Sequence, residues 1–586
     1  TIIDLKNNQI AGREIKIEFE KSYFGDKNND PVLKGKSSHS DEKNLKIYKA
    51  VFSTCNVEKK KCRGWELNSD EFNHDKEKRI FEYNNSWLKI FDYKVFFLPY
   101  FNHPDPSIDR KTGFLTPSYS SSDTLGTSIK FPYFKVLSDD KDITFNPRYY
   151  ADKSFLLQNE YRQALKNSNI LSDFSFLVGE DGTKSHFFYN QIGDLNENIN
   201  YQLNLQDVKG DNYLKRHNLI NTSPLINSES LLLSNLDISW KFNRSNLFTS
   251  FKIYEDLTRN YHDRYQYIFP DFNFVKSIDL PDSYNGFFDF NSYGYNKNYN
   301  TNVNEASLTN DFLFSSIDHV TKNGFLNNYY LLLKNSNSYA NNSNNFDENE
   351  SYDLFGTFKY DLSLPLKKTD ISYTNYLKPI LSFRYSPNGN TDLSSKDLLL
   401  NFDNVFNLNR ISTNTQVEGG EALSLGIEFQ RENNIIGDEL NFRLANVFKL
   451  DKDNKLPSKS KLDQTRSDIF GDINYRPNKN LKFGYSFSYD RDLKYSNLEA
   501  LNVDLSVNNF FSDFYYFTED NDFGNSENIT NATTLKFNKE NILKFTTSKD
   551  LDDDFTQFYN FIYEYSNYWF WINWIIGSNI ISKCWL

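Results

Sequence analysis

The residues that could do acid–base or metal chemistry are scattered through this sequence. Its seven histidines are His39, His74, His103, His186, His217, His262 and His319. None has the spacing of a metal site, and none accompanies the sharp turn that presents a nucleophilic serine. The run Asp552–Asp554 is typical of a solvated turn, and no glycine-rich loop could cradle a nucleotide phosphate. The sequence therefore predicts no enzymatic activity, no metal and no cofactor.

Thiol chemistry is limited to Cys55, Cys62 and Cys584. The first two stand seven residues apart, without the spacing or the histidine neighbours of a zinc site. A disulfide formed in an oxidising compartment is the favoured interpretation, and free thiols are the alternative. The sequence contains no Met and no secretion signal. We therefore expect a processed chain or a fragment whose signal has been lost upstream.

The composition combines a polar average with many aromatic residues. Hydrophobic residues make up 38% of the 586 residues and the mean hydropathy is −0.67, yet 53 Phe, 39 Tyr and 7 Trp are present. Apolar residues at every second position of many strands reconcile the two, because each sheet then has a wet face and an apolar face. The net charge of −12 argues against a nucleic-acid partner. The longest apolar stretch, Tyr568–Gly577, is too short for a membrane-spanning helix.

Alternation with a period of two predicts β-strands. Between Leu481 and Asp490 apolar residues alternate with polar ones, and the pattern recurs in 381–385 and 423–429. A soluble sandwich also alternates, but long strands with this aromatic load favour an outer-membrane barrel, whose strands need about 9–11 residues. At roughly 18–20 residues per strand and connection, we expect residues 106–586 to form a large antiparallel transmembrane β-barrel of about 24–26 strands, in an all-β protein.

The first hundred residues have a different pattern. Short strand-like segments such as 45–52 and 86–91 follow one another closely, with charged turns between them. We interpret residues 1–105 as the C-terminal part of a periplasmic β-jelly-roll domain whose beginning is absent. The plug domain of a siderophore-type receptor would usually be longer.

The most specific motifs begin where these two parts join. They read Pro99-Tyr-Phe-Asn-His-Pro-Asp-Pro106, Arg110-Lys-Thr-Gly-Phe-Leu-Thr-Pro117, Pro132-Tyr-Phe134, Asp142-Ile-Thr-Phe-Asn-Pro147, Asn159-Glu-Tyr-Arg162, Val417-Glu-Gly-Gly420 and Asp468-Ile-Phe-Gly471. Together they resemble the LptD family of lipopolysaccharide-assembly proteins, also called the OstA/Imp family. The resemblance covers about residues 1–567.

The resemblance implies a function in outer-membrane biogenesis. Proteins of this family take lipopolysaccharide from an LptA-like periplasmic bridge and hold an LptE-like lipoprotein plug in the barrel lumen. They release the lipid into the outer leaflet through a lateral gate between the first and last barrel strands. The resemblance thus implies the outer membrane of a Gram-negative bacterium, with the N-terminal domain in the periplasm. The alternative is a passive porin or a TonB-dependent-type receptor, but the former would lack the N-terminal domain and the latter would carry a plug and an energy-coupling segment.

In this context the first barrel strands predict a weak seam. Pro117 and Pro132 fall in the first two strands, and each removes a hydrogen bond of the ladder. Such a bond contributes about 0.5–1.5 kcal/mol in water and more in lipid. With Gly113 and Phe114, these prolines form the predicted lateral gate. The alternative is that both prolines merely mark turns.

The junction motif provides the predicted substrate path. Its residues are Pro99, Tyr100, His103, Pro104, Arg110 and Lys111. The two cations could meet the phosphates of lipid A or be solvated turn charges. For His103 a turn-forming role is favoured over catalysis. Asp142 and Pro147 receive no role beyond shaping the next hairpin.

The C-terminal end departs from the family pattern. The family commonly continues with alternating strands after residue 567, whereas this chain loses the period of two in Tyr568–Gly577. We expect a truncated or frame-shifted end that lacks the closing strand. In the family, N-terminal cysteines bond to cysteines near the C-terminus. Here Cys55 and Cys62 could bond to each other or to the barrel, and Cys584 is the third candidate.

Overall fold

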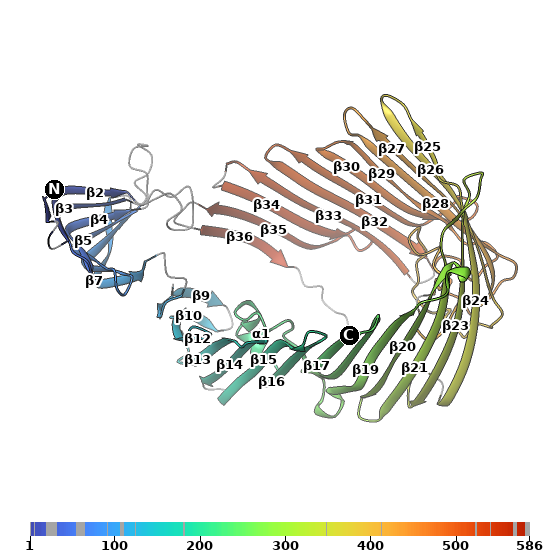
Figure 1. Cartoon of the computed structure of the whole chain (residues 1–586), viewed down its shortest axis with the longest axis horizontal. Helices are drawn as coiled ribbons and strands as arrows, with labels where there is room; N and C mark the ends of the chain where they lie inside the picture. Colours follow the sequence, from blue (N-terminus) through green and yellow to red (C-terminus); the bar gives the residue numbers. More distant parts are fainter. Residues whose placement is uncertain are drawn as a thin grey trace. The chain divides into compact units, whose positions relative to one another are not determined.

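The structure is a computed structural model. It describes residues 2–4, 6, 8–18, 32–53, 65–90, 92–105, 110–115, 117–122, 125–179, 182–346, 348–411, 413–521, 524–538, 541–566 and 571–579. This part of the chain consists almost entirely of antiparallel strands (Figure 1), and none of its helices is long and apolar enough to cross a membrane. It forms two compact units. The first contains the chain up to residue 163 and the segment 175–183, and the second contains 164–174 and the chain from 184 onward, without 567–570.

The first unit begins with a seven-stranded sheet whose strands follow sequence order. These strands are β1 (Ile2–Asp4), β2 (Gln9–Glu18), β3 (Val32–Ser40), β4 (Asn44–Ser53), β5 (Trp65–Asp75), β6 (Ile80–Ile90) and β7 (Tyr93–Pro104). Its core comprises Leu33, Ile47, Ala50, Phe52, Leu67, Phe72, Phe81 and Tyr83. The predicted strand 45–52 lies within β4. The short strand expected at 86–91 is instead the second half of β6, which continues past Asn85 although that residue has a φ of +49° and is left out of the pairing with β5.

The same unit continues with short strands after the junction motif. These are β8 (Gly113–Phe114), β9 (Ser118–Ser122), β10 (Gly126–Lys130), β11 (Tyr133–Ser138), β12 (Lys141–Tyr150) and β13 (Phe155–Ala164). They lie in an antiparallel arrangement, and Pro117 and Pro132 fall between successive strands.

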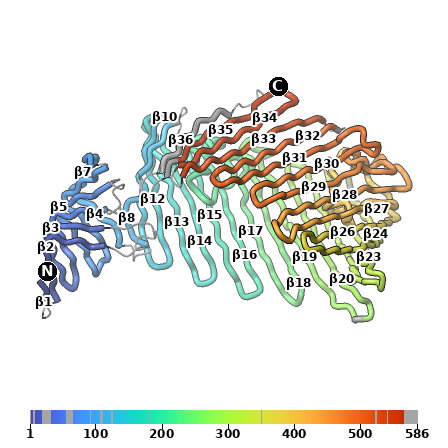
Figure 2. The backbone as a smooth tube through the Cα atoms, turned by 90° about the horizontal axis from the view of Figure 1, so that it is seen from above, coloured from blue at the N-terminus to red at the C-terminus, as the bar shows by residue number. Residues whose placement is uncertain are grey.

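The remaining elements belong almost entirely to the second unit. They are β14 (Ser168–Gly179), β15 (Gly182–Asn196), β16 (Ile199–Lys209), α1 (Tyr213–Arg216), η1 (Leu219–Asn221), β17 (Leu231–Phe242), β18 (Ser245–Asp256), η2 (Tyr261–Asp263), β19 (Tyr265–Ile278), η3 (Asp282–Tyr284), β20 (Gly286–Tyr299), β21 (Val303–Ser316), β22 (His319–Val320), β23 (Leu326–Asn341), β24 (Asn349–Ser363), β25 (Leu366–Thr369), β26 (Tyr373–Ser386), β27 (Gly420–Asn433), β28 (Glu439–Lys449), β29 (Ile469–Asn478), β30 (Leu481–Tyr489), β31 (Ser496–Val507), β32 (Phe510–Asn521), β33 (Gly524–Lys536), β34 (Asn541–Asp550), β35 (Phe555–Ser566) and β36 (Trp571–Asn579). Figure 2 shows them as successive hairpins lying side by side.

The period of two in the sequence sets these strands, and tight turns set their register. β30 covers the alternating segment that begins at Leu481, as predicted. Between β17 and β18, Asn243 and Arg244 both have positive φ, which is the requirement of a two-residue type I′ turn. The turn places Phe242 opposite Ser245 and fixes every later pair of that hairpin.

Four strands in the described residues are interrupted. β8 and β9, β10 and β11, β21 and β22, and β24 and β25 each form two parts of one strand, so the 29 elements from β8 to β36 make 25 strands. The predicted fold class, an all-β protein dominated by a large antiparallel β-barrel of about 24–26 strands, is confirmed. The segment 571–579, where the alternation is lost, also forms a strand and pairs with β35.

Long connections of the second unit lie at one end of its hairpins. Antiparallel hairpins turn at alternate ends, which places the loops 210–230, 387–419 and 450–468 together and the short turn at 243–244 at the other end. The latter two loops are folded, because Leu400, Ile411, Leu456 and Leu462 are buried in one core with residues of β27–β29.

Candidate functional site

The first strands after the junction motif are interrupted at two prolines. Pro117 lies between β8 and β9, and Pro132 lies between β10 and β11. Because β8 pairs with β11 and β9 with β10, the two interruptions are neighbours. The pairing stops at Phe114 opposite Tyr133 and resumes at Ser118 opposite Lys130.

A third proline lies next to these interruptions, inside the neighbouring strand. Pro147 stands in β12, and its carbonyl accepts a hydrogen bond from the amide of Phe131 at 3.1 Å. The carbonyl of Pro132 accepts one from the amide of Leu115 at 2.9 Å. Since proline has no amide hydrogen, three neighbouring strands each lack a backbone donor at about the same position along the strand direction. We call β8–β12 the proline-interrupted strands.

Gly113 and Phe114 form the shortest element of this region. Phe114 stands opposite Tyr133, and Gly113 opposite Phe134. The rings of Phe114 and Tyr133 lie edge to face with centroids 5.0 Å apart, while the Phe114 side chain is largely exposed. Two residue pairs therefore hold β8 to its neighbour, which is the least extensive pairing among these strands.

Three of the sequence motifs meet at Asp142. Its buried carboxylate accepts hydrogen bonds from Nη2 of Arg110 at 2.5 Å and from Nε of Arg162 at 2.9 Å. Arg110 also donates to the backbone carbonyl of Asp139. Arg110 is thus paired within the protein instead of being a solvated turn charge, and Asp142 has a structural role that the sequence did not reveal.

Lys111 differs from its neighbour. Its ammonium nitrogen is buried and has no hydrogen-bond partner among the described residues. Burial lowers the pKa of this group, while the carboxylates of Asp75 and Glu82 oppose that shift. Lys111 therefore lies close to the acidic end of the N-terminal sheet.

The other junction residues lie on β7, the outermost strand of that sheet in the described chain. Pro99 and Pro104 occupy positions where a missing donor is tolerated. The hydroxyl of Tyr100 donates to Glu82 at 2.8 Å.

His103 is in a strand, so the turn-forming role expected for it is wrong. Its Nε2 lies 3.0 Å from the Tyr83 hydroxyl, and its ring packs against Phe81. Burial lowers the pKa of His103, despite the carbonyl of Pro104 beside Nδ1. A neutral imidazole within an aromatic core explains the position better than a turn does. Cys55, Cys62 and Cys584 lie outside the described residues.

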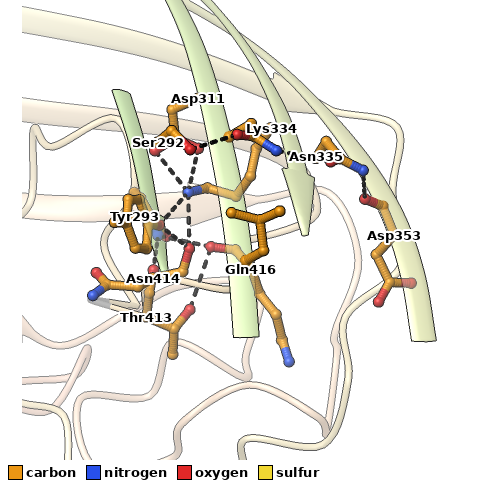
Figure 3. A network of polar contacts seen from close by, with 12 residues as sticks. Ser292, Tyr293, Asp311, Lys334, Asn335, Asp353, Thr413, Asn414 and Gln416 are labelled. Atoms are coloured by element: carbon orange, nitrogen blue, oxygen red, sulfur yellow. Dashed lines mark hydrogen bonds and ion pairs between the residues drawn. The ribbon is translucent and has the colours of Figure 1, made fainter. Parts of the chain in front are cut away.

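A second candidate region is the wall formed by β20–β28, which the loops 387–419 and 450–468 cover. We call it the loop-covered wall. Figure 3 shows how the first loop is attached: Nζ of Lys334 contacts the carboxylate of Asp311 at 2.6 Å, the Tyr293 hydroxyl at 3.0 Å and the backbone carbonyl of Asn414 at 2.9 Å. The Tyr293 hydroxyl donates to the same carbonyl. Val417 packs beside these contacts on Leu332 and Phe355.

A buried ion cluster attaches the end of the same loop. Arg410 forms a two-pronged pair with Glu418, at 2.8 Å through Nε and 2.5 Å through Nη2, and donates to Ser424 of β27. Arg384 of β26 donates to the backbone carbonyls of Leu408 and Glu418. Burial alone would raise the pKa of Glu418, but the charges of Arg410 and Arg384 lower it to about 2. Glu418 is therefore a permanent anion that holds the loop to the wall.

The structure explains the residue types found in the Val417–Gly420 and Asp468–Gly471 motifs. A side chain at Gly419 would collide with the backbone oxygen of Asn388, and Gly420 has a φ of +82°, where other residues are strained. Burial raises the pKa of Asp468 to about 6, although Asn497 and Ser488 donate to it. Glu418 and Asp468 could have been singled out from these motifs, whereas Lys334, Arg384 and Arg410 lie outside every motif.

The fold and these two regions define a class of protein: a large antiparallel β-barrel with interrupted first strands and a loop-covered wall. A family model described as "LptD: LPS transport system D" matches residues 182–549, more than half of the chain. The chain belongs to this LptD family. The family description is that of a transport system, so the prediction that the protein is not an enzyme is confirmed.

Several curated relatives carry the name LPS-assembly protein LptD. The one from Pseudoalteromonas translucida is 34% identical over 181 residues, which cover 30% of this chain and 23% of the relative. Those from Nitrosococcus oceani and Idiomarina loihiensis are 28% and 26% identical, covering 36% and 28% of this chain and 28% and 22% of the relative. The alignments thus span about a quarter of the length of these relatives. A structural alignment with the solved ferric preacinetobactin receptor of Acinetobacter baumannii covers 87% of this chain and 84% of the receptor. The two are 7% identical, and the TM-score of 0.27 is too low to indicate a shared fold.

Proposed function

We propose that this protein inserts lipopolysaccharide into the outer leaflet of the outer membrane of a Gram-negative bacterium. The N-terminal sheet, residues 1–105, is the proposed periplasmic jelly-roll part that receives the lipid from an LptA-like bridge. The barrel, residues 106–586, surrounds an LptE-like lipoprotein plug and passes the lipid sideways through a gate at its first strands. Family membership and the names of the relatives support the substrate.

The observation that carries the gate is the interruption of two neighbouring strands at Pro117 and Pro132, with Pro147 beside them inside the continuous strand β12. A strand in lipid must satisfy its backbone groups within the sheet, so a missing donor at one level of three strands lowers the cost of separating them there. The route past the junction would then lead along Pro99–Pro104 and Lys111, whose buried ammonium is suited to a phosphate of lipid A.

Two experiments test this function. Depletion of the protein in a living Gram-negative cell should reduce surface lipopolysaccharide while the uptake of small solutes continues. Loss of uptake with unchanged surface lipopolysaccharide would favour the porin or receptor alternative. Chemical crosslinking of the segment 113–119 to the last barrel strand should block export, and undiminished export would remove the gate from the proposal.

A further inference from the structure

The inner face of the loop-covered wall carries an unusual row of cations. In the register of the sheet, Lys359 of β24 stands opposite Arg384 of β26, Arg384 opposite Ala422 of β27, and Ala422 opposite Lys449 of β28. Like charges directly opposite one another are destabilising in a sheet. Arg410 reaches the same place from the loop 387–419, since its Nη1 lies 3.1 Å from Ser424. We call Lys359, Arg384, Arg410 and Lys449 the cationic row.

Protein carboxylates neutralise this row incompletely. Lys359 pairs with Asp361 at 2.5 Å, and Arg410 with Glu418. Within the described chain, Nζ of Lys449 and Nη1 of Arg384 are buried without a hydrogen-bond partner. Arg384 is 3% exposed and lies 3.8 Å from Glu418. Lys449 is attracted by the carboxylates of Glu418 and, more weakly, Asp453, but Glu418 is shared with Arg410 and Arg384, and the oxygens of Asp453 accept from Asn390 and the amide of Lys455.

The geometry of the row suits a phosphate. Neighbouring strands lie about 4.8 Å apart, so β26 and β28 are separated by roughly 10 Å, and the small side chain of Ala422 lies between Arg384 and Lys449. In the structure the guanidinium of Arg410 and the carboxylate of Glu418, both buried, lie beside Arg384 and Lys449. Arginine and lysine donors arranged in this way are the usual partners of phosphate oxygens.

We propose that the cationic row binds a phosphate group carried on a sugar, and that Glu418 takes its place while the loop 387–419 is closed. The proposal rests on the proposed function, because it assigns the row to the phosphorylated glycolipid in transit. The contacts of Lys334 and Tyr293 with Asn414 hold the loop closed, and their release uncovers the row. Glu418 thus competes with the substrate for the same donors.

The test compares three probes on the full chain in detergent: lipopolysaccharide, the same material after dephosphorylation, and inorganic phosphate. Lys449→Gln removes a cation that has no hydrogen-bond partner among the described residues. The variant should therefore fold normally and bind phosphorylated lipopolysaccharide about tenfold less tightly, the effect of one lost charged hydrogen bond. Lys452→Gln removes an exposed charge from the same loop region and is the matched control. Glu418→Gln should change affinity in the opposite direction, because it removes the competing carboxylate.

The outcomes separate this proposal from the function it rests on. Equal binding of intact and dephosphorylated material, or equal affinity of wild type and Lys449→Gln, would overturn the phosphate site even where depletion still abolishes surface lipopolysaccharide. Binding of inorganic phosphate that Lys449→Gln abolishes supports the site and identifies free phosphate as a ligand. A photoreactive residue at position 422 should label phosphorylated lipopolysaccharide in wild type, and more strongly in Tyr293→Phe. The absence of labelling in both would overturn the proposal.

Discussion

The proline-interrupted strands and the loop-covered wall are both antiparallel sheet, but their neighbouring strands are joined by very different numbers of residue pairs. β8 is held to β11 by two residue pairs, and β9 to β10 by five. By contrast, β20 pairs with β21 without interruption from Gly286 to Tyr299, and β23 with β24 from Leu326 to Ala340. One region lacks amide donors where two interrupted strands lie side by side. The other has longer ladders and folded loops that cover it, although two of its strands are also interrupted, between β21 and β22 and between β24 and β25.

The difference shows how a barrel can contain a weak region without becoming unstable. Each residue pair of a ladder contributes little by itself, so strand separation depends on how many consecutive pairs must be broken. The loop-covered wall gains further stability from buried side chains and ion pairs. The proline-interrupted strands depend on fewer pairs and on the buried carboxylate of Asp142, which binds Arg110 and Arg162.

Removal of the anion from the loop-covered wall should have the largest effect on stability. Glu418→Gln leaves the buried Arg410 and Arg384 without a carboxylate, so we expect a loss of about 3–5 kcal/mol and rapid proteolysis within the loop 387–419. The double variant Arg410→Met, Glu418→Leu removes the anion together with Arg410 and should lose less stability than Glu418→Gln, because, of the two arginines, only Arg384 is then left without the carboxylate. Equal stability of Glu418→Gln and wild type in urea unfolding would contradict the assignment of this pair as the loop's attachment.

Asp142→Asn should weaken the other region. Arg110 and Arg162 would lose their shared charged acceptor, and a hydrogen bond to a charged group contributes about 1.5–3 kcal/mol. Since both arginines are partly exposed, we expect about 2 kcal/mol or less, seen as faster amide exchange in β11–β13. Asp139→Asn is the control, because Arg110 contacts only its backbone carbonyl. A similar change in both variants would exclude the carboxylate as the cause.

Replacement of the prolines should restore backbone amide donors and make the proline-interrupted strands pair more like the loop-covered wall. Pro117→Val and Pro132→Val each supply an amide hydrogen, and we expect a gain of about 0.5–1.5 kcal/mol per bond as slower amide exchange in 113–122, together with slower export. Pro379→Val is the matched control, since Pro379 lies inside β26 of the loop-covered wall. Unchanged exchange at 113–122 would show that the prolines do not limit pairing there.

The smallest effect should come from pH, and it should act on the N-terminal sheet. Burial lowers the pKa of His74 and of His103 below the ordinary value of 6.5. The unfolded chain therefore binds more protons below this value, so the sheet should lose stability as the pH falls from 6.5 toward the folded pKa values. Amide exchange in β5–β7 should increase over this interval, while exchange in β20–β24 stays constant. His74→Gln with His103→Gln should abolish the difference; a pH dependence that persists would assign it elsewhere.

Local physics accounts for what the sequence predicted well. The alternation at 481–489 predicted β30, because a strand with one buried and one wet face requires a period of two. The junction motifs drew attention to Pro117, Pro132 and Asp142, since proline lacks a donor wherever it stands. The two prolines lie at the interruptions, whereas their role as a gate stays a prediction.

Long-range contacts account for what the sequence did not reveal. The cationic row joins Lys359, Arg384 and Lys449, which lie far apart in the chain and meet only because the register of four strands aligns them. His103 likewise resembled a turn residue until β6 and β7 enclosed it in an aromatic core.

The sequence by itself determined that the chain forms many antiparallel strands, since backbone pairing and side-chain alternation are properties of each segment. Only the tertiary structure decided which loops fold onto the wall and which charges they cover. Burial, and with it the strength of an ion pair, depends on neighbours that no single segment contains.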